Sequence, residues 1–283
     1  MATFTNYATL SYRGGTINSN TVTGEILETI TAAKTAVTSN YTADGDVTYV
    51  ISLVNSSNAP VNGLTVRDDL GGYTVDGNTV YPLAYMDGTV RYFVNGVLQA
   101  APAVTSGPPL TISGINVPAG GSVLLIYETS VTNYAPLGVD AVITNTATVT
   151  GGGLTEPVTA TETIETEDVA ALTIIKALDP AVVTDNSQIT YTFVIENRGN
   201  TAVVATDDVV VTDTFDPILE NIVVSFNGVI WTAGTNYTYN SETGVFSSLP
   251  GQITIPAATY TQNTDGTWTI TPGVGVLTVT GTI

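Results

Sequence analysis

Two segments of this chain repeat each other at a constant separation. Residues 47–55 (VTYVISLVN) match residues 189–197 (ITYTFVIEN), and the offset of 142 (189 − 47) also relates Lys34 to Lys176. The match continues through three further pairs of segments, 65–70 with 210–215, Asn95-Gly96-Val97 with Asn227-Gly228-Val229, and Val123-Leu124 with Val276-Leu277. A repeat of this length indicates two copies of one domain.

The strand-like segment that closes the first copy reappears near the start of the chain. Residues 143–148 (ITNTAT) resemble residues 4–9 (FTNYAT), and the second copy shows no such segment after its last match. A β-sandwich that lacks one strand leaves unpaired backbone groups and an uncovered apolar floor. We therefore expect residues 1–12 to be a donor strand that completes the second domain of a neighbouring chain, with one face made of Phe4, Asn6, Ala8 and Leu10.

Two alternative roles for this first segment stay open. The segment is a remnant of a longer array of repeats, or it pairs back within its own first domain. In the donor interpretation the contact between chains is head-to-tail and need not close into a ring, so repetition produces a filament.

The composition favours strands and turns over helices. The chain has 27 glycines, 13 prolines and 43% apolar residues, and its apolar positions alternate over short segments that end in turn sequences such as ADGD at 43–46. We predict an all-β protein with two tandem immunoglobulin-like β-sandwich domains. The expected organisation is a donor strand at 1–12, an acidic connector or hairpin at 13–29, a complete sandwich at 30–150, a second acidic connector or hairpin at 151–170, and an incomplete sandwich at 171–283.

Charge and residue usage exclude several classes of function. With 25 acidic and 6 basic residues, the formal net charge of −19 disfavours nucleic acid and anionic membranes as partners. The chain has no cysteine and no histidine, which removes disulfides, thiolate metal sites and the commonest metal ligand, so we expect no cofactor and no metal. Calcium at the acidic turns stays an alternative, although none has the spacing of a known calcium loop. The opening MATFTN does not have the form of a signal peptide, and no apolar run reaches membrane-spanning length.

Each repeat places three polar residues on faces that otherwise read as core. Alternation along the predicted strands puts these residues among apolar neighbours in both copies. They are Lys34, Asp68 and Asn145 in the first domain, and Lys176, Asp213 and the donated Asn6 in the second. Burial disfavours the charged form of a lysine, and a neutral lysine amine is a nucleophile.

A buried lysine beside an asparagine can form an isopeptide bond with loss of ammonia, in one self-limiting reaction that proximity drives. We expect an intramolecular bond from Lys34 to Asn145 with Asp68 as the assisting acid. We expect an intermolecular bond from Lys176 to Asn6 with Asp213 as the acid. The alternative is a buried salt bridge between Lys and Asp, with Asn only hydrogen-bonded. Glu128, aligned with Gly281, is a rival acid in the first domain.

These features together resemble a known repeat of bacterial surface proteins. An opening-strand lysine, the pattern TYxxxxxN, then VxDx(L/F), and the closing ITNTATV are similar to the repeat called domain of unknown function eleven, twice over nearly the whole chain. In length and duplicated organisation the chain is also similar to the major subunits of ribbon-like endospore appendages. This resemblance implies a structural protein on a spore or cell surface.

We therefore predict a subunit that polymerises with itself into an extracellular filament or appendage. No catalytic motif for an external substrate is visible, and the only chemistry expected is the single-turnover formation of isopeptide bonds. The alternatives are a ligand-binding adhesin or stalk module of a larger surface protein, and a spacer stiffened by calcium.

Overall fold

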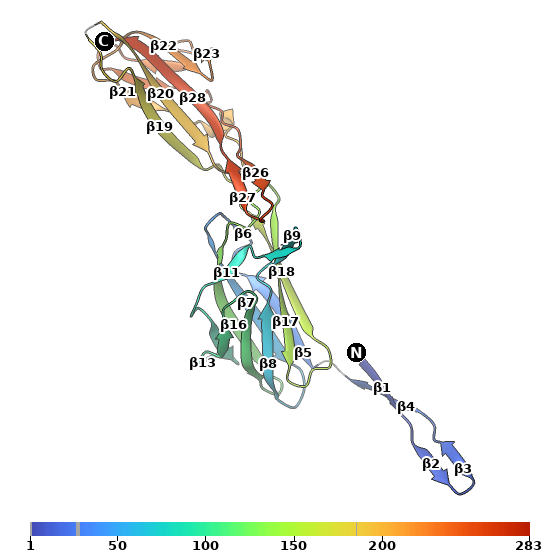
Figure 1. Cartoon of the computed structure of the whole chain (residues 1–283). Coiled ribbons are helices and arrows are strands. Elements are labelled where there is room, and N and C mark those ends of the chain that lie inside the picture. Colours follow the sequence, from blue (N-terminus) through green and yellow to red (C-terminus); the bar gives the residue numbers. More distant parts are fainter. Residues whose placement is uncertain (1, 27–28, 185) are drawn as a thin grey trace. The chain divides into compact units, whose positions relative to one another are not determined.

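The computed structural model describes residues 2–26, 29–184 and 186–283, and almost all of its regular structure is β-strand (Figure 1). The chain divides into two compact units, Met1–Ala135 with Val142–Glu165 and Pro136–Ala141 with Thr166–Ile283. Each unit contains one β-sandwich, so the predicted all-β fold with two immunoglobulin-like domains is confirmed. Among the described residues the single helical element is the short 3-10 helix η1 (Ala205–Asp207), and none forms a helix that could span a membrane.

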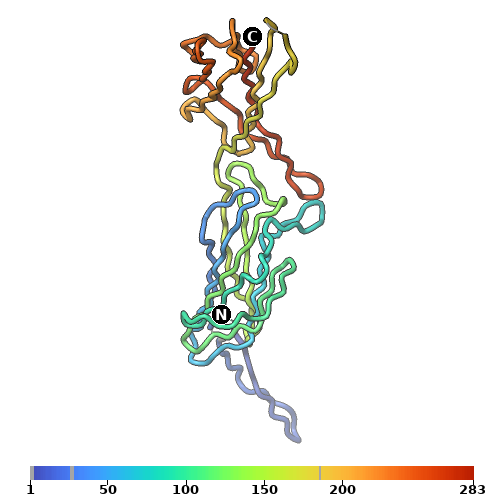
Figure 2. The backbone as a smooth tube through the Cα atoms, turned by 90° about the vertical axis from the view of Figure 1, so that its left-hand side faces the viewer, coloured from blue at the N-terminus to red at the C-terminus, as the bar shows by residue number. Residues whose placement is uncertain are grey.

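The N-terminal segment folds back on itself as a two-stranded ribbon (Figures 1 and 2). Strand β1 (Ala2–Asn6) pairs with β4 (Val22–Ile26), and β2 (Thr9–Tyr12) pairs with β3 (Gly15–Asn18). The segments expected as donor strand and connector are thus the two arms of one hairpin, which we call the N-terminal hairpin.

The first sandwich consists of two six-stranded sheets. The first sheet has the order β13-β12-β16-β7-β5, with β11 also on β16, and the second has the order β14-β15-β8-β17-β18-β6. The first contains β5 (Ile30–Ala36), β7 (Asp46–Asn55), β11 (Leu83–Tyr85), β12 (Arg91–Val94), β13 (Val97–Gln99) and β16 (Ser122–Val131). The second contains β6 (Asn40–Tyr41), β8 (Val61–Asp68), β14 (Ala103–Thr105), β15 (Leu110–Val117), β17 (Val142–Gly151) and β18 (Val158–Thr166). A separate hairpin joins β9 (Tyr73–Val75) and β10 (Asn78–Val80).

The strand that completes the first sandwich is one arm of a hairpin. Strand β17 lies between β8 and β18, with Ala147 opposite Asp68 and Asn145 opposite Glu162. After β17 the chain turns at three glycines, and at Gly152 (φ +59°) a Cβ would lie 2.6 Å from Val61 Cγ1. The segment expected as the second connector therefore contains this turn and the second arm, β18.

The second sandwich pairs a five-stranded sheet with a three-stranded one. Their orders are β19-β20-β28-β22-β23 and β21-β25-β24. The first contains β19 (Leu172–Asp179), β20 (Gln188–Asn197), β22 (Glu220–Phe226), β23 (Val229–Ile230) and β28 (Gly273–Thr282). The second contains β21 (Thr212–Thr214), β24 (Tyr237–Tyr239) and β25 (Val245–Ser248), and a separate hairpin joins β26 (Thr259–Gln262) to β27 (Trp268–Thr271).

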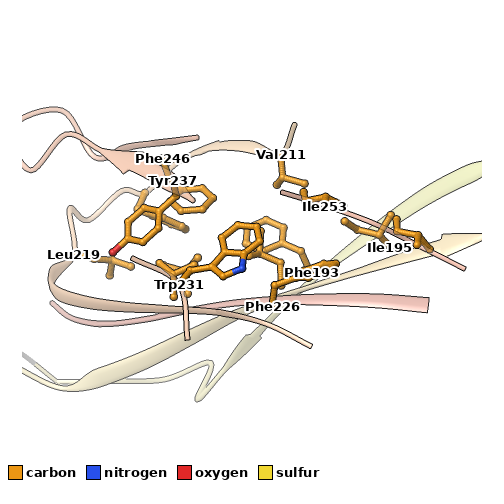
Figure 3. Packing of buried hydrophobic residues seen from close by; sticks show 14 of the residues in the cluster. Phe193, Ile195, Val211, Leu219, Phe226, Trp231, Tyr237, Phe246 and Ile253 are labelled. Carbon is orange, nitrogen blue, oxygen red and sulfur yellow. The ribbon is translucent and has the colours of Figure 1, made fainter. Parts of the chain in front are cut away.

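Aromatic side chains from both sheets fill the core of the second sandwich (Figure 3). The ring centroids of Phe226 and Trp231 are 5.5 Å apart, and those of Tyr237 and Phe246 are 5.6 Å apart. Large rings of this kind contribute much of a small core because each buries a large apolar area. This core holds the second domain together without a strand on the outer edge of β21.

The strand ladders refine the alignment of the two repeats. Leu125 pairs with Ile51, and Leu277 pairs with Phe193, and these two partners are related by the offset of 142 (193 − 51). Leu277 is therefore the counterpart of Leu125, one residue away from the alignment expected from the sequence.

Candidate functional site

A buried ion pair joins the two sheets of the first sandwich. Lys34 lies on β5 and Asp68 at the end of β8, and the distance from Lys34 Nζ to Asp68 Oδ2 is 2.6 Å. The two side chains are 0% and 1% exposed. Removing two charges from water is costly, and this pair is stable only because each charge compensates the other.

The side chain of Asn145 lies in the same buried region. Asn145 is on β17, next to β8, and it is completely buried. Neither its amide nitrogen nor its amide oxygen makes a hydrogen bond in the described part of the protein. An unsatisfied buried amide costs roughly 1–3 kcal/mol, so an additional interaction of this group would remove a substantial penalty.

Two tyrosines that the sequence did not single out complete the first cluster. The Tyr127 hydroxyl donates a hydrogen bond to Asp68 Oδ2 at 2.5 Å, and the ring of Tyr49 lies 4.7 Å from Lys34 Nζ. Glu128, the rival acid, is exposed and its side chain lies outside the cluster. The signal for the tyrosines was available, because both occupy inward positions of strongly alternating strands.

Burial changes the protonation of the groups in this cluster. Desolvation lowers the pKa of Lys34, although the neighbouring Asp68 opposes this shift. Desolvation also raises the pKa of Tyr49 and of Tyr127, so both hydroxyls stay protonated, while the nearby Asn145 amide acts in the opposite direction on each. Lys34 and the Asn145 amide both act on Tyr49, and a lysine with a lowered pKa can attack the carbonyl carbon of an amide that comes into contact with it.

The second domain contains the same pair in a more open form. Lys176 on β19 lies 2.5 Å from Asp213 on β21, and these side chains are 42% and 18% exposed. The Lys176 ammonium lies over three aromatic rings, at 4.5 Å from Tyr191 and 5.6 Å from Phe193 and Phe215. Lys176 and Asp213 thus form the same pair as Lys34 and Asp68, but both side chains of the second pair are partly exposed to solvent.

The register of the strands also shows where the two clusters differ chemically. Val279 is the counterpart of Tyr127, because their cross-strand partners Tyr191 and Tyr49 are related by the same offset of 142 (191 − 49). The position aligned with Glu128 is Thr280 rather than the expected Gly281. The carboxylate of Asp213 therefore receives no hydrogen bond from a tyrosine on β28.

An open sheet edge lies beside the second cluster. Strand β21 is the edge of its sheet and pairs with β25, whereas its counterpart β8 pairs with β15 and also with β17. The neighbouring strand β19 is exposed along its whole length. Leu172 is 40% exposed, while its counterpart Ile30 in the first domain is 1% exposed. An unpaired edge next to exposed apolar side chains is a template for an additional strand.

The expected donor residues lie in the N-terminal hairpin and face solvent. Phe4 and Asn6 are in β1, Leu10 is in β2, and Ala8 lies between the strands, where its backbone N–H donates to Ser19 Oγ. Phe4 is 54% and Leu10 61% exposed. A segment that resembles β17 in sequence thus exposes its apolar side chains to solvent.

Comparisons with known proteins give distant matches in structure alone. No family model matches the chain, and no curated protein matches it. Among the described residues, no group of three or more acidic side chains is placed to hold a metal ion.

The chain is similar to solved structures of pilins and adhesins. BcpA, the major pilin subunit of Bacillus cereus, is 14% identical, with a TM-score of 0.36 over 95% of this chain and 73% of that chain. The pilus backbone RrgB from Streptococcus pneumoniae is 12% identical, with a TM-score of 0.33 over 83% and 54%. The collagen-binding domain from a Staphylococcus aureus adhesin is 14% identical, with a TM-score of 0.31 over 50% and 99%. This chain thus spans about half of the pneumococcal protein.

Proposed function

We propose that this protein is the structural subunit of a head-to-tail filament on the surface of a bacterial cell or spore. One observation carries the proposal. In the first domain, β17 pairs with β8 and completes the sandwich. A segment similar to β17 lies in the exposed N-terminal hairpin, and β21, the counterpart of β8 in the second domain, has one unpaired edge. The hairpin of one copy supplies what the second domain of the next copy lacks.

The first domain provides the register for this contact. Ala147 lies opposite Asp68 and Val149 opposite Val66. The matching residues of the hairpin are Ala8 and Leu10, which would lie opposite Asp213 and Val211 of the neighbouring copy. Asn6 then takes the position of Asn145 and comes to lie beside Lys176.

An isopeptide bond in each completed domain would make the filament covalent. In this reaction Lys Nζ forms a bond to Asn Cγ, the bond from Cγ to Nδ2 breaks, and the nitrogen leaves as ammonia. The acid, Asp68 or Asp213, holds the proton that Nζ loses and returns it to the leaving nitrogen. The bond from Lys34 to Asn145 closes within one chain, and the bond from Lys176 to Asn6 joins two chains. Each site reacts once, so the protein is not an enzyme.

The assembly step is tested by two substitutions on neighbouring residues of β1. Phe4→Asp places a charge on the face that docks, and Thr5→Asp places the same charge on the opposite face. We expect the unchanged chain and Thr5→Asp to form filaments in negative-stain images, and Phe4→Asp to remain monomeric. Filaments of the Phe4→Asp chain would overturn the proposal. If the unchanged chain is a stable monomer, a stalk or adhesin module is the better interpretation.

The covalent step is tested separately. After boiling in detergent, the unchanged chain should run as a ladder of multimers, while Lys176→Ala and Asn6→Ala should run as monomers. Intact mass should show the loss of one ammonia within each Lys176→Ala monomer, and this loss should disappear when Lys34 is also replaced by Met. Monomers in all three lanes would show that assembly, if present, is not covalent.

A further inference from the structure

We infer that the whole N-terminal hairpin, and not its first strand alone, is the unit that docks into the neighbouring copy. Its second arm, β3 and β4, would then occupy the place that β18 has in the first domain. This inference rests on the proposed head-to-tail assembly and adds a second contact to it, with residues 181–184 of the neighbour.

The two faces of the hairpin differ in polarity. Cross-strand partners share a face, and the ladder pairs Asn6 with Val22, Phe4 with Gly24, and Leu10 with Ile17. Val22 and Ile17 are both exposed large apolar side chains. The opposite face carries mainly hydroxyl, amide and acidic groups, on Thr3, Thr5, Thr9, Asn18, Thr23 and Glu25. Both arms therefore contribute apolar side chains to the face that carries Asn6, and docking of the first strand alone would leave those of the second arm exposed.

The packing of one cross-strand pair matches its counterpart in the first domain. There, Ile143 lies opposite Ile164, and both are buried. In the hairpin the corresponding pair is Phe4 and Gly24, and a Cβ on Gly24 would lie 2.4 Å from Phe4 Cζ. The Phe4 ring thus occupies the space above its partner strand, so one large and one very small residue replace two of medium size. This exchange of volume is expected if both arms face the same kind of core.

The receiving side of the second domain is also incomplete where the second arm would lie. In the first domain β18 is flanked by β6, and the Glu165 N–H donates to the Ser39 carbonyl at 2.9 Å. The offset of 142 places the counterpart of β6 at residues 182–183, which form no strand in the described chain. Tyr41 in β6 is buried, whereas its counterpart Val183 is only partly buried against the core, and Val182, the counterpart of the exposed Asn40, is 90% exposed. Docking of the second arm would order this segment as a short edge strand.

A donated hairpin is also easier to insert than a donated strand. The five cross-strand pairs of β1 with β4 already satisfy one edge of β1, so only its other edge has to find a partner on β21. Separating the two arms would break these pairs before new ones form, while a preformed hairpin loses less conformational entropy on binding.

Val22→Asp and Thr23→Asp on β4 test this inference. The two variants carry the same charge on opposite faces of the second arm, beyond the first strand. We expect Thr23→Asp to form filaments like the unchanged chain, and Val22→Asp to raise the concentration needed for assembly at least tenfold, measured by light scattering. Equal assembly of both variants would overturn hairpin docking, and if Phe4→Asp still fails to assemble, the proposed function stands.

Hydrogen exchange provides a second measurement that does not depend on a variant of the second arm. The backbone amides of residues 181–184 should exchange fast in the monomer of Phe4→Asp and at least tenfold more slowly in filaments of the unchanged chain. Exchange of these amides at equal rates in both states would show that the second arm stays outside the sandwich.

Discussion

The two lysines of this chain occupy equivalent strand positions but have different surroundings. The Lys34 side chain is fully buried beside Asp68, whereas that of Lys176 is 42% exposed. Under our proposal this difference sets the order of events. The first cluster is complete as soon as its domain folds, and the second is complete only after a neighbour docks.

Tyr127 distinguishes the first cluster from the second. Replacing it with Phe keeps the ring but removes a hydrogen bond to the Asp68 carboxylate. In a chain that also carries Asn145→Ala and cannot form the bond, we expect Tyr127→Phe to destabilise the first domain by about 1.5–3 kcal/mol, the range for a hydrogen bond to a charged group. Urea unfolding measures this difference, and a change below the error of the method would show that the hydroxyl is not an important partner of Asp68.

The buried lysine should make the stability of the uncrosslinked first domain depend on pH. Burial lowers the pKa of Lys34 below its ordinary value of 10.5. Between the lowered value and the ordinary one, the unfolded chain binds more protons than the folded chain, so the free energy of unfolding rises with pH. As the pH rises toward 10.5, the Asn145→Ala chain should therefore gain stability relative to the double variant Asn145→Ala with Lys34→Met.

The comparison with Lys34→Met removes both the titration of this lysine and its ion pair with Asp68. The other ionisable groups that act on Lys34 or share its cluster are present in both chains, and they are Asp68, Asp69, Glu162, Tyr49 and Tyr127. Parallel pH profiles of the two chains would mean that Lys34 keeps an ordinary pKa in the folded domain.

At the scale of elements, the N-terminal hairpin and the β17–β18 hairpin are both antiparallel pairs with similar first strands, but their cross-strand side chains differ in size. The pair of Phe4 and Gly24 replaces the pair of Ile143 and Ile164. Because the Phe4 ring fills the space above Gly24, a side chain at position 24 should be tolerated only when position 4 is smaller.

The contact between Phe4 and Gly24 predicts that substitutions at these two positions compensate each other. Gly24→Ile alone should weaken assembly, because its side chain displaces the Phe4 ring, and Phe4→Ile alone should weaken it by leaving a gap. The double variant reproduces the isoleucine pair of the first domain and should assemble better than either single variant, with a coupling of about 0.5–3 kcal/mol in a double-mutant cycle. Additive effects on the critical concentration would contradict direct packing between the two positions.

At the scale of the whole molecule, our proposal implies that the position of one hairpin in the chain decides whether the product is a monomer or a filament. In the first domain, residues 132–141 connect β16 to the hairpin that completes the sandwich. A chain with residues 1–28 moved behind Ile283, through a linker copied from residues 132–141, would complete its second domain in the same way.

This rearranged chain should be monomeric and have a more stable second domain. Burying one leucine or isoleucine contributes roughly 1.5–3 kcal/mol, and 1 kcal/mol shifts the Tm of a domain of this size by about 4 °C. Covering Leu172 and Ile174 should therefore raise the Tm of the second domain by at least about 10 °C, measured by calorimetry against Phe4→Asp. Filaments of the rearranged chain would show that assembly uses a different surface.

The sequence alone predicted the repeats, the all-β class and several of the buried polar residues. The period of two along a strand determines which residues share a face, so the repeats, the all-β class and the inward direction of Lys34, Asp68 and Asn145 followed from the sequence alone. The role of Tyr127 did not follow, because the residue that meets Asp68 depends on the register of β16 against β7 and on how two sheets face each other. Bulges such as the register shift between Glu220 and Val223 are set by the whole ladder and not by local pattern.

The sequence by itself therefore determined two sandwiches, a strand-like segment repeated at the start of the chain, a lysine and an acid in each domain, and the asparagine of the first domain. The tertiary structure alone decided that the repeated segment comes with a second arm, that β21 is an open edge, and that Lys176 is only partly covered. The reason is physical: alternation fixes the face of each residue within one strand, but pairing between strands, and whether an edge is occupied, is a property of the assembled sheet.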